Sequence, residues 1–413
     1  VSALARVLLR DPRELARHVA MSPSAPVEGG ILERASDGTL RLPALTTAHS
    51  HAFQRAMRGR AQRPGLGADG PDDFWTWRGQ MYALASSLTP ESLHSVSLVA
   101  FRELARAGVR TVGEFHYLHH QPDGTPYEDR TVLADAVVRA AKDAGLRIAL
   151  LRVAYQRAGA GRPPEGAQRR FCDPNVDDVL RDVDTLRARW RGDPDVVVGV
   201  APHSVRAVSP DWLDPLRDYA DRNATPLHMH VAEREREVHE CVAESGLRPI
   251  ELLADRGVLS ERFVAVHGMH VLPHEASLLG AARAFVCMCP TTERDLGDGL
   301  ADVRALRAAG VRLCSGVDSH VVVDPIEDLR ALETHERLRT RTRVTFRPAS
   351  GTPAEELWRE GSLQGAAACG FADAGGRLVV RRDHPALALV DDEFVLDAIV
   401  FGAGIGIVER VDP

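Results

Sequence analysis

The chain has 413 residues, of which 44% are hydrophobic and 26% are charged, and its formal net charge is −7. This balance is typical of a soluble globular protein with a large core, and the negative charge argues against a nucleic-acid or anionic-membrane partner. No apolar run approaches the ~18 residues of a membrane span, and the first thirty residues lack the apolar core of a secretory signal.

The N-terminal part of the chain carries helical, turn and strand patterns. Residues 1–20 have helical spacing, and a Pro/Ser/Gly-rich stretch follows them. Asp37-Gly38 predicts a turn between two short strands, and residues 40–47 read as a strand that leads into a His-x-His motif. After an Arg/Gly-rich loop, helical patterns begin at Asp72 and again over residues 90–106.

From residue 109 onward, strands and helices alternate. The expected strands cover residues 109–117, 146–155, 196–203, 226–232, 263–268, 284–290 and 313–318. The expected helices cover residues 129–145, 177–191, 209–224, 233–245, 249–256, 273–280, 300–309 and 325–341. Together with the strand before the His-x-His motif, this makes eight βα units. The pattern predicts an α/β fold, a (β/α)8 TIM-type barrel, with an open doubly wound sheet as the alternative.

The C-terminal residues turn strand-like again, over 378–381, 386–390 and 398–401. We expect these segments to pair with residues 31–45 in a small satellite β domain. The expected domains are therefore an N-terminal segment (1–40) in the small β domain, a catalytic barrel (41–372) and a C-terminal return to the small domain (373–413).

Cysteine usage points to a reducing compartment. The six cysteines are scattered, form no CxxC pair and mostly lie in apolar runs, which favours buried free thiols over disulfides or a zinc knuckle. A cytoplasmic protein with a small-molecule partner is expected, and a homodimer is compatible with the sequence.

Histidines and acids collect where the predicted strands end. In a barrel, the active site lies at the C-terminal ends of the strands. Six strand ends carry such residues: His49 and His51; Glu114 and His116; His203; His228 and His230; His267 and His270; Asp318 and His320. One buried histidine is usually a core residue with satisfied hydrogen bonds, but packing alone does not explain six strand ends with the same chemistry.

These residue types favour a metal site. Three imidazoles and one carboxylate bind zinc and leave a position for water, whose pKa falls to roughly 7 so that hydroxide forms at neutral pH. Glu233 follows His230 by three residues and is placed to take the proton of that water and pass it to a leaving group. The alternative interpretation of Glu233 is an acid that stabilises a helix N-terminus.

The strand-end pattern resembles the amidohydrolase superfamily, and His-x-x-Glu on the fifth strand resembles its single-metal deaminase branch. The resemblance implies Glu233 as a proton shuttle, His267 as the residue that polarises the hydroxide or the tetrahedral intermediate, and Asp318 as an aid to proton removal. It implies four metal ligands: His49, His51, His230 and Asp318. Because Lys142, the chain's single lysine, falls on a predicted helix, no carboxylated lysine can bridge two ions. One divalent metal per chain is expected, with Zn2+ favoured over iron or manganese.

Further motifs resemble the N-formimidoyl-L-glutamate deiminase family over about residues 40–345. They include His49-Ser-His-Ala-Phe-Gln-Arg55, Phe74-Trp-Thr-Trp-Arg78, Glu114-Phe-His-Tyr117, His203-Ser-Val-Arg206, Cys289-Pro-Thr-Thr-Glu293 and Leu296-Gly-Asp-Gly299. The resemblance implies hydrolysis of N-formimidoyl-L-glutamate to N-formyl-L-glutamate and ammonia in histidine degradation, by attack of metal-bound hydroxide on the formimidoyl carbon.

This family's pattern also implies the residues that bind the substrate's two carboxylates. Dicarboxylate recognition calls for arginine forks and neutral donors. Arg206 and Tyr117 would contact one carboxylate, Arg78 and Gln54 the other, and His203 would line the pocket. Two other hypotheses are a related single-metal deaminase acting on a purine, pyrimidine or triazine ring, and a barrel that binds metal or ligand without turnover.

Overall fold

The computed structural model describes residues 30–63 and 74–413, and within these ranges an eight-stranded parallel sheet organises the chain. Its strands follow one another in chain order: β3 (Leu45–Ser50), β4 (Val109–His116), β5 (Arg147–Ala154), β6 (Val196–Pro202), β7 (Leu227–Val231), β8 (Phe263–His267), β9 (Phe285–Met288) and β10 (Arg312–Ser315). The helix expected over residues 1–20 lies outside the described residues.

The sheet closes into a barrel between its first and last strands. Just beyond β10, Asp318 forms a parallel bridge with Ser50 at the end of β3. The Asp318 amide donates to the His49 carbonyl at 3.1 Å, and the His51 amide donates to the Asp318 carbonyl at 2.9 Å. Gly316 permits this approach, because a Cβ at that position would lie 2.7 Å from the His49 Cβ and carbonyl oxygen. The expected barrel is confirmed.

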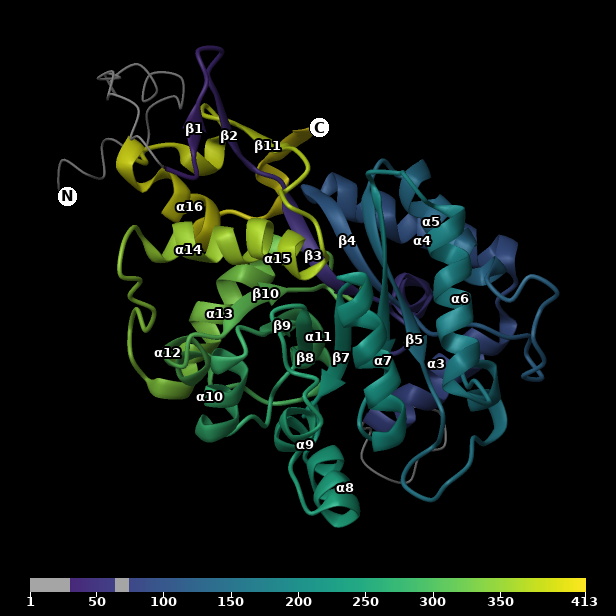
Figure 1. Ribbon diagram of the computed structural model, residues 1–413. Coiled ribbons are helices and arrows are strands. Elements are labelled where there is room, and N and C mark those ends of the chain that lie inside the picture. Colours follow the sequence, from purple (N-terminus) through teal and green to yellow (C-terminus); the bar gives the residue numbers. More distant parts are fainter. Residues whose placement is uncertain (1–29, 64–73) are drawn as a thin grey trace.

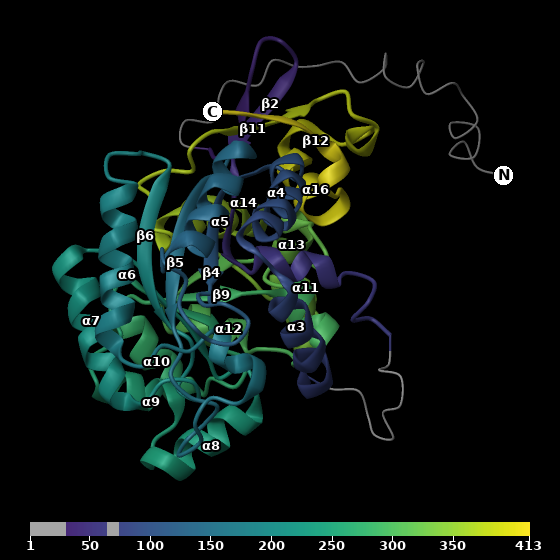
Figure 2. The ribbon, with the colours of Figure 1, turned by 90° about the vertical axis from the view of Figure 1, so that its right-hand side faces the viewer.

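Helices cover the outside of the barrel (Figures 1 and 2). They are α3 (Phe74–Ser87), α4 (Pro90–Arg106), α5 (Val132–Asp143), α6 (Val176–Arg189), α7 (Pro210–Asn223), α8 (Glu235–Ser245), α9 (Pro249–Asp255), α10 (Pro273–Ala281), α12 (Val303–Ala308) and α13 (Pro325–Thr340). Sequence patterns did not indicate α11 (Pro290–Leu296), α14 (Pro353–Arg359) or α15 (Gly365–Ala368), the last two of which are joined by a π-helical turn, Glu360–Gln364.

A second, antiparallel sheet is built from the two ends of the described chain and lies at one end of the molecule in Figure 1. Its strand order is β1 (Glu33–Arg34), β2 (Thr39–Pro43), β11 (Arg377–Arg381) and β12 (Val408–Asp412). The expected pairing of the chain ends is confirmed, with Val379 opposite Arg41 in the register of β11 and β2. The proposed domain boundaries at residues 40 and 372 stay predictions.

Three strand assignments were wrong. The strand expected over residues 40–47 is divided between β2 and β3, which belong to different sheets and flank Ala44. Residues 386–390 overlap a 3-10 turn, Pro385–Leu387. The strand expected over 398–401 lies within helix α16 (Val395–Gly402). In α16 the buried Val395, Leu396, Ile399 and Val400 recur at helical spacing, whereas the short apolar run read alone resembled a strand.

We expect Trp358→Ala to lower the free energy of unfolding by about 3–5 kcal/mol, because the large side chain would leave a cavity. Trp358 of α14 is fully buried, and its Nε1–H donates to the Pro43 carbonyl at 3.0 Å, between the two sheets. Urea denaturation measures the change. Leu338→Ala is the control, since Leu338 is 73% exposed; equal losses in both variants would contradict this role of Trp358.

Among the residues that the structure describes, no helix combines the length and the apolar character needed to cross a membrane.

Candidate active site

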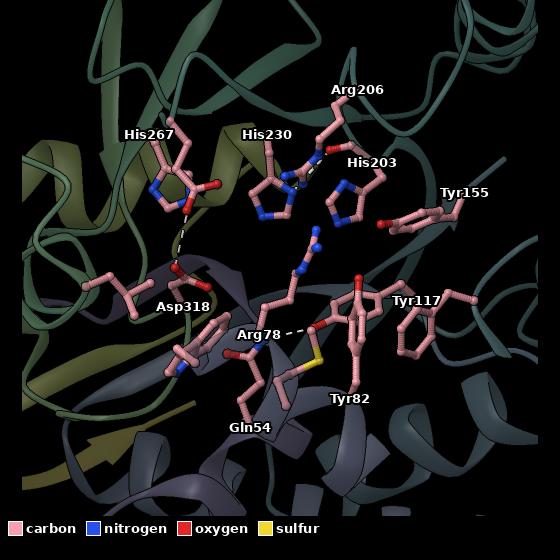
Figure 3. A pocket seen from close by; sticks show the side chains of 15 residues that line it. Gln54, Arg78, Tyr82, Tyr117, Tyr155, His203, Arg206, His230, His267 and Asp318 are labelled. Carbon is pink, nitrogen blue, oxygen red and sulfur yellow. Dashed lines mark hydrogen bonds and ion pairs between the residues drawn. The ribbon is translucent and has the colours of Figure 1, made fainter. Parts of the chain in front are cut away.

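A pocket with about 540 Å³ of empty space opens at the C-terminal ends of the barrel strands (Figure 3). Nine of the eleven residues singled out by sequence line it: Gln54, Arg78, Tyr117, His203, Arg206, His230, Glu233, His267 and Asp318. The other two, His49 and His51, are buried beside His230. His49 and Asp318, which are 269 positions apart in the sequence, therefore lie close together.

Four side chains converge on a small space at one end of the pocket. The Nε2 atom of His49 lies 3.2 Å from both His51 Nε2 and His230 Nε2. The Oδ1 atom of Asp318 lies 3.6 Å from His49 Nε2 and 3.4 Å from His51 Nε2. Asp318 adopts a left-handed backbone conformation, with φ 52°, which is costly for a residue other than glycine and typical of functional sites.

The protonation state of these imidazoles is the one needed to bind a cation. His51 Nδ1 faces the Phe115 carbonyl at 2.9 Å, and His230 Nδ1 faces the His203 carbonyl at 3.1 Å. Because a carbonyl can only accept, each Nδ1 carries a proton, and in the neutral ring Nε2 turns its lone pair toward the cluster. Burial keeps the rings neutral: it lowers the pKa of His49 to about 3 and that of His230 well below its usual value.

The Nε2 lone pairs of His51 and His230 and the carboxylate oxygen Oδ1 of Asp318 therefore face one another inside the protein. A divalent cation would stabilise this arrangement. Three imidazoles and one carboxylate are the donor set that zinc accepts in catalytic sites. The residues present therefore fit the metal that the sequence led us to expect.

His267, at the end of β8, faces the same space. Its Nδ1 lies 3.2 Å from Glu293 Oε1, and its Nε2 lies 3.9 Å from Asp318 Oδ2. Burial opposes a charge on this ring, but the protein's own carboxylates at Glu233, Glu293 and Asp318 raise its pKa to about 10. The ring is therefore placed to hold a proton next to a developing negative charge.

A buried hydrogen-bond chain supports the His-x-His motif from behind. The Ser50 hydroxyl donates to Glu114 Oε2 at 2.6 Å and lies 2.8 Å from His320 Nε2. The second oxygen of Glu114 accepts from the Ala52 amide at 2.9 Å. Burial raises the pKa of Glu114 to about 8. Ser50 stands between the two histidines, so this chain links β3, β4 and the segment that follows Asp318.

We expect Glu114→Gln to weaken metal binding by about 10- to 100-fold, the usual effect of losing a hydrogen bond that supports a ligand. The amide offers one acceptor oxygen in place of the two oxygens that face the Ser50 hydroxyl and the Ala52 N–H. Competition with a chromophoric chelator measures the affinity. Glu235→Gln, at an exposed position on α8, is the matched control. An unchanged metal affinity in Glu114→Gln would show that the chain does not position the ligands.

Glu237 was not singled out by sequence, yet it fixes the loop that carries Glu233. Its Oε1 accepts from the Ala232 amide at 2.9 Å, and Ala232 has a left-handed backbone with φ 50°. Burial raises the pKa of Glu237 to about 7, while the nearby Arg206 guanidinium opposes this shift. Glu237 lies in the first turn of α8 (Glu235–Ser245), where an acidic residue is common in any helix, so no sequence signal separated it from an ordinary N-terminal acid.

The other end of the pocket carries arginines, amides and phenols. Gln54 Nε2 donates to the Tyr117 hydroxyl at 2.8 Å. Arg78 packs against the Tyr82 ring, 5.4 Å from its centre. In Figure 3 the Arg78 guanidinium extends into the middle of the pocket, and Arg206 approaches from the opposite side.

Six further residues line the pocket, none of which was assigned a role from the sequence: Trp77, Met81, Tyr82, Tyr155, Phe171 and Leu296. They are apolar or aromatic, and such residues carry no chemical signature that separates a pocket wall from the core. Other histidines lie elsewhere. His228 Nε2, for example, faces the Ala368 carbonyl at 2.8 Å, and His119 Nε2 faces the Val153 carbonyl at 2.9 Å.

Comparisons with known proteins agree with this geometry. The profile described as "Amidohydrolase family" matches residues 40–401. The chain is 36% identical over 372 residues to formimidoylglutamate deiminase of Pseudomonas aeruginosa, covering 88% of this chain and 81% of that protein. It is 30% identical over 282 residues to 8-oxoguanine deaminase of the same species, covering 67% and 59%. The crystal structure of an amidohydrolase from Brucella melitensis superposes with a TM-score of 0.80 at 35% identity, covering 90% of this chain and 82% of that one.

Proposed function

Because the chain belongs to the amidohydrolase family, we propose that it hydrolyses N-formimidoyl-L-glutamate to N-formyl-L-glutamate and ammonia, a step of histidine degradation. One observation carries the proposal. A single pocket joins a cation-binding cluster and an acid, Glu233, to two arginines, Arg78 and Arg206. The relative from Pseudomonas aeruginosa named formimidoylglutamate deiminase supports it.

The arginines suit the acidic end of this substrate. N-formimidoyl-L-glutamate carries two carboxylates, and guanidinium groups bind carboxylates through paired, charge-assisted hydrogen bonds. Arg206 stays charged despite its burial, because Tyr155, Glu237 and Glu233 raise its pKa against the cost of desolvation. Tyr117 and Gln54, already hydrogen-bonded to each other, add neutral donors, and His203 forms part of the wall.

His49, His51, His230 and Asp318 would hold one divalent cation, for which Zn2+ suits the donors. When bound, such a cation lowers the pKa of water and so makes it a nucleophile at neutral pH. This supplies the reaction with an attacking group that the side chains alone do not offer.

The side chains would then move the protons. A carboxylate oxygen of Glu233 accepts the proton that water loses as its oxygen bonds to the formimidoyl carbon. The His267 ring, held at Nδ1 by Glu293, stabilises the negative charge on that oxygen. Glu233 returns its proton to the nitrogen that leaves as ammonia, and Asp318 accepts the second proton of the former water as its oxygen becomes the carbonyl oxygen.

The experiment is to compare ammonia release from N-formimidoyl-L-glutamate with release from 8-oxoguanine and 5′-methylthioadenosine. We expect release from the first alone, because the two guanidinium groups of Arg78 and Arg206 suit carboxylates, which these two purines lack. N-formyl-L-glutamate should accumulate in equal amount. Faster release from a purine would overturn the substrate assignment while leaving the family intact. A cytoplasmic location and a homodimer stay predictions.

A further inference from the structure

A cysteine lies beside the proposed catalytic centre and has no part in the reaction described above. Cys289 directly follows β9 and is fully buried. Its Sγ, a His267 ring nitrogen and an Asp318 carboxylate oxygen all lie within 4.8 Å of one another. The three residues come from the ends of three consecutive barrel strands, and two of them, His267 and Asp318, line the pocket.

The two oxygens of Asp318 face different sets of donors. Oδ1 lies 3.4 Å from His51 Nε2 and 3.6 Å from His49 Nε2. Oδ2 is turned toward His267 Nε2, at 3.9 Å. Asp318 can therefore contribute one oxygen to each of two adjacent cations, as bridging carboxylates do in two-metal sites with ions about 3.5–4 Å apart.

Glu293 holds the other two donors in place. Its Oε1 lies 3.2 Å from His267 Nδ1 and accepts from the Cys289 amide at 2.8 Å. With Nδ1 held, the His267 ring presents Nε2 to the pocket. The Cys289 thiol, in turn, has a distant contact with the Cys287 carbonyl, at 4.0 Å, which a stronger ligand bond can replace.

We propose that His267, Cys289 and Asp318 form a second, inhibitory site for a thiophilic divalent cation such as Cd2+ or excess Zn2+. Sulfur, nitrogen and oxygen donors in this number suit such ions, with water completing the coordination. Each ion bound releases two protons to solvent, one from the Cys289 thiol and one from Nε2 of the charged His267 ring. Occupation stops turnover because the cation takes the His267 and Asp318 atoms that the reaction uses.

The test is a titration of the zinc-loaded enzyme with Cd2+, following the ultraviolet thiolate-to-cadmium absorption, retained zinc and ammonia release on the same sample. We expect the absorption to rise and activity to fall together and to saturate near one Cd2+ per chain, with zinc retained. Cys289→Ser and Cys289→Ala should lose both responses. Cys172→Ser, at the partly exposed cysteine, should keep both.

X-ray absorption at the cadmium edge of the wild-type protein tests the ligands without any variant. One sulfur among nitrogen and oxygen neighbours is expected. Two sulfurs would place the ion among the neighbouring buried thiols of Cys287, Cys289 and Cys314 and not at His267 and Asp318, and would overturn the proposal. So would an activity loss that accompanies zinc release, or an absorption that persists in the Cys289 variants. The spectra do not depend on the substrate, so they remain decisive if the proposed deiminase activity is absent.

Discussion

Glu233→Gln is expected to slow ammonia release by about 10²- to 10⁴-fold, the usual contribution of a positioned general acid–base. The amide keeps the size of the side chain but can neither accept the proton of water nor return one to the leaving nitrogen. Glu233 lines the pocket three residues beyond His230, and its charge helps to raise the pKa of the nearby His267. Steady-state kinetics should show the loss in kcat, with KM little changed.

Metal content separates this role from a structural one. Glu233→Gln should bind as much metal as the wild type, because Glu233 is not among the four converging ligands. Glu235→Gln, two residues along and exposed, should retain full activity. Near wild-type turnover in a metal-loaded Glu233→Gln enzyme would remove Glu233 from the mechanism.

Arg206→Gln should lower kcat/KM for N-formimidoyl-L-glutamate by about 150-fold, equivalent to about 3 kcal/mol for losing one partner of a buried charge pair. Arg206 lines the pocket and stays charged there, so its removal leaves a substrate carboxylate without a guanidinium in a desolvated place. Most of the loss should appear in KM if the carboxylate is bound equally in the ground and transition states.

A substrate in which one carboxylate is replaced by an amide tests whether Arg206 binds that carboxylate. In the wild type, replacing the carboxylate that Arg206 binds by an amide should lower kcat/KM about as much as the Arg206→Gln mutation does. In Arg206→Gln, the same replacement should lower kcat/KM little further. Arg222→Gln, at an exposed position on α7, is the matched control. Additive losses with each of the two monoamide substrates in turn would mean that Arg206 binds neither carboxylate.

The sequence predicted the barrel because its signals are periodic and local. Alternation of apolar strands and amphipathic helices recurs eight times, and each His or Asp of the cluster ends a strand. The barrel's topology then brings those strand ends together without further information. The boundary at Ala44 was missed because residues 40–47 were read as one strand, although Pro43, directly before Ala44, is a residue that often marks the end of a strand.

What the sequence could not predict depends on distant contacts. Ser50 and Glu114 are 64 positions apart, and nothing in either segment shows that the hydroxyl and carboxylate meet. The same holds for Tyr155 and Phe171, which form a pocket wall only because the loops fold over the barrel. The family resemblance supplied Arg78 and Arg206, whose role no local pattern indicates.

Metal-dependent hydrolysis of N-formimidoyl-L-glutamate is tested most directly by measuring metal content and ammonia release on one purified sample supplied with this substrate. We predict about one divalent metal per chain and equal amounts of ammonia and N-formyl-L-glutamate, with release lost on chelation and restored by Zn2+. A sample that holds its metal, releases no ammonia from this substrate and deaminates a purine would contradict the proposed deiminase function.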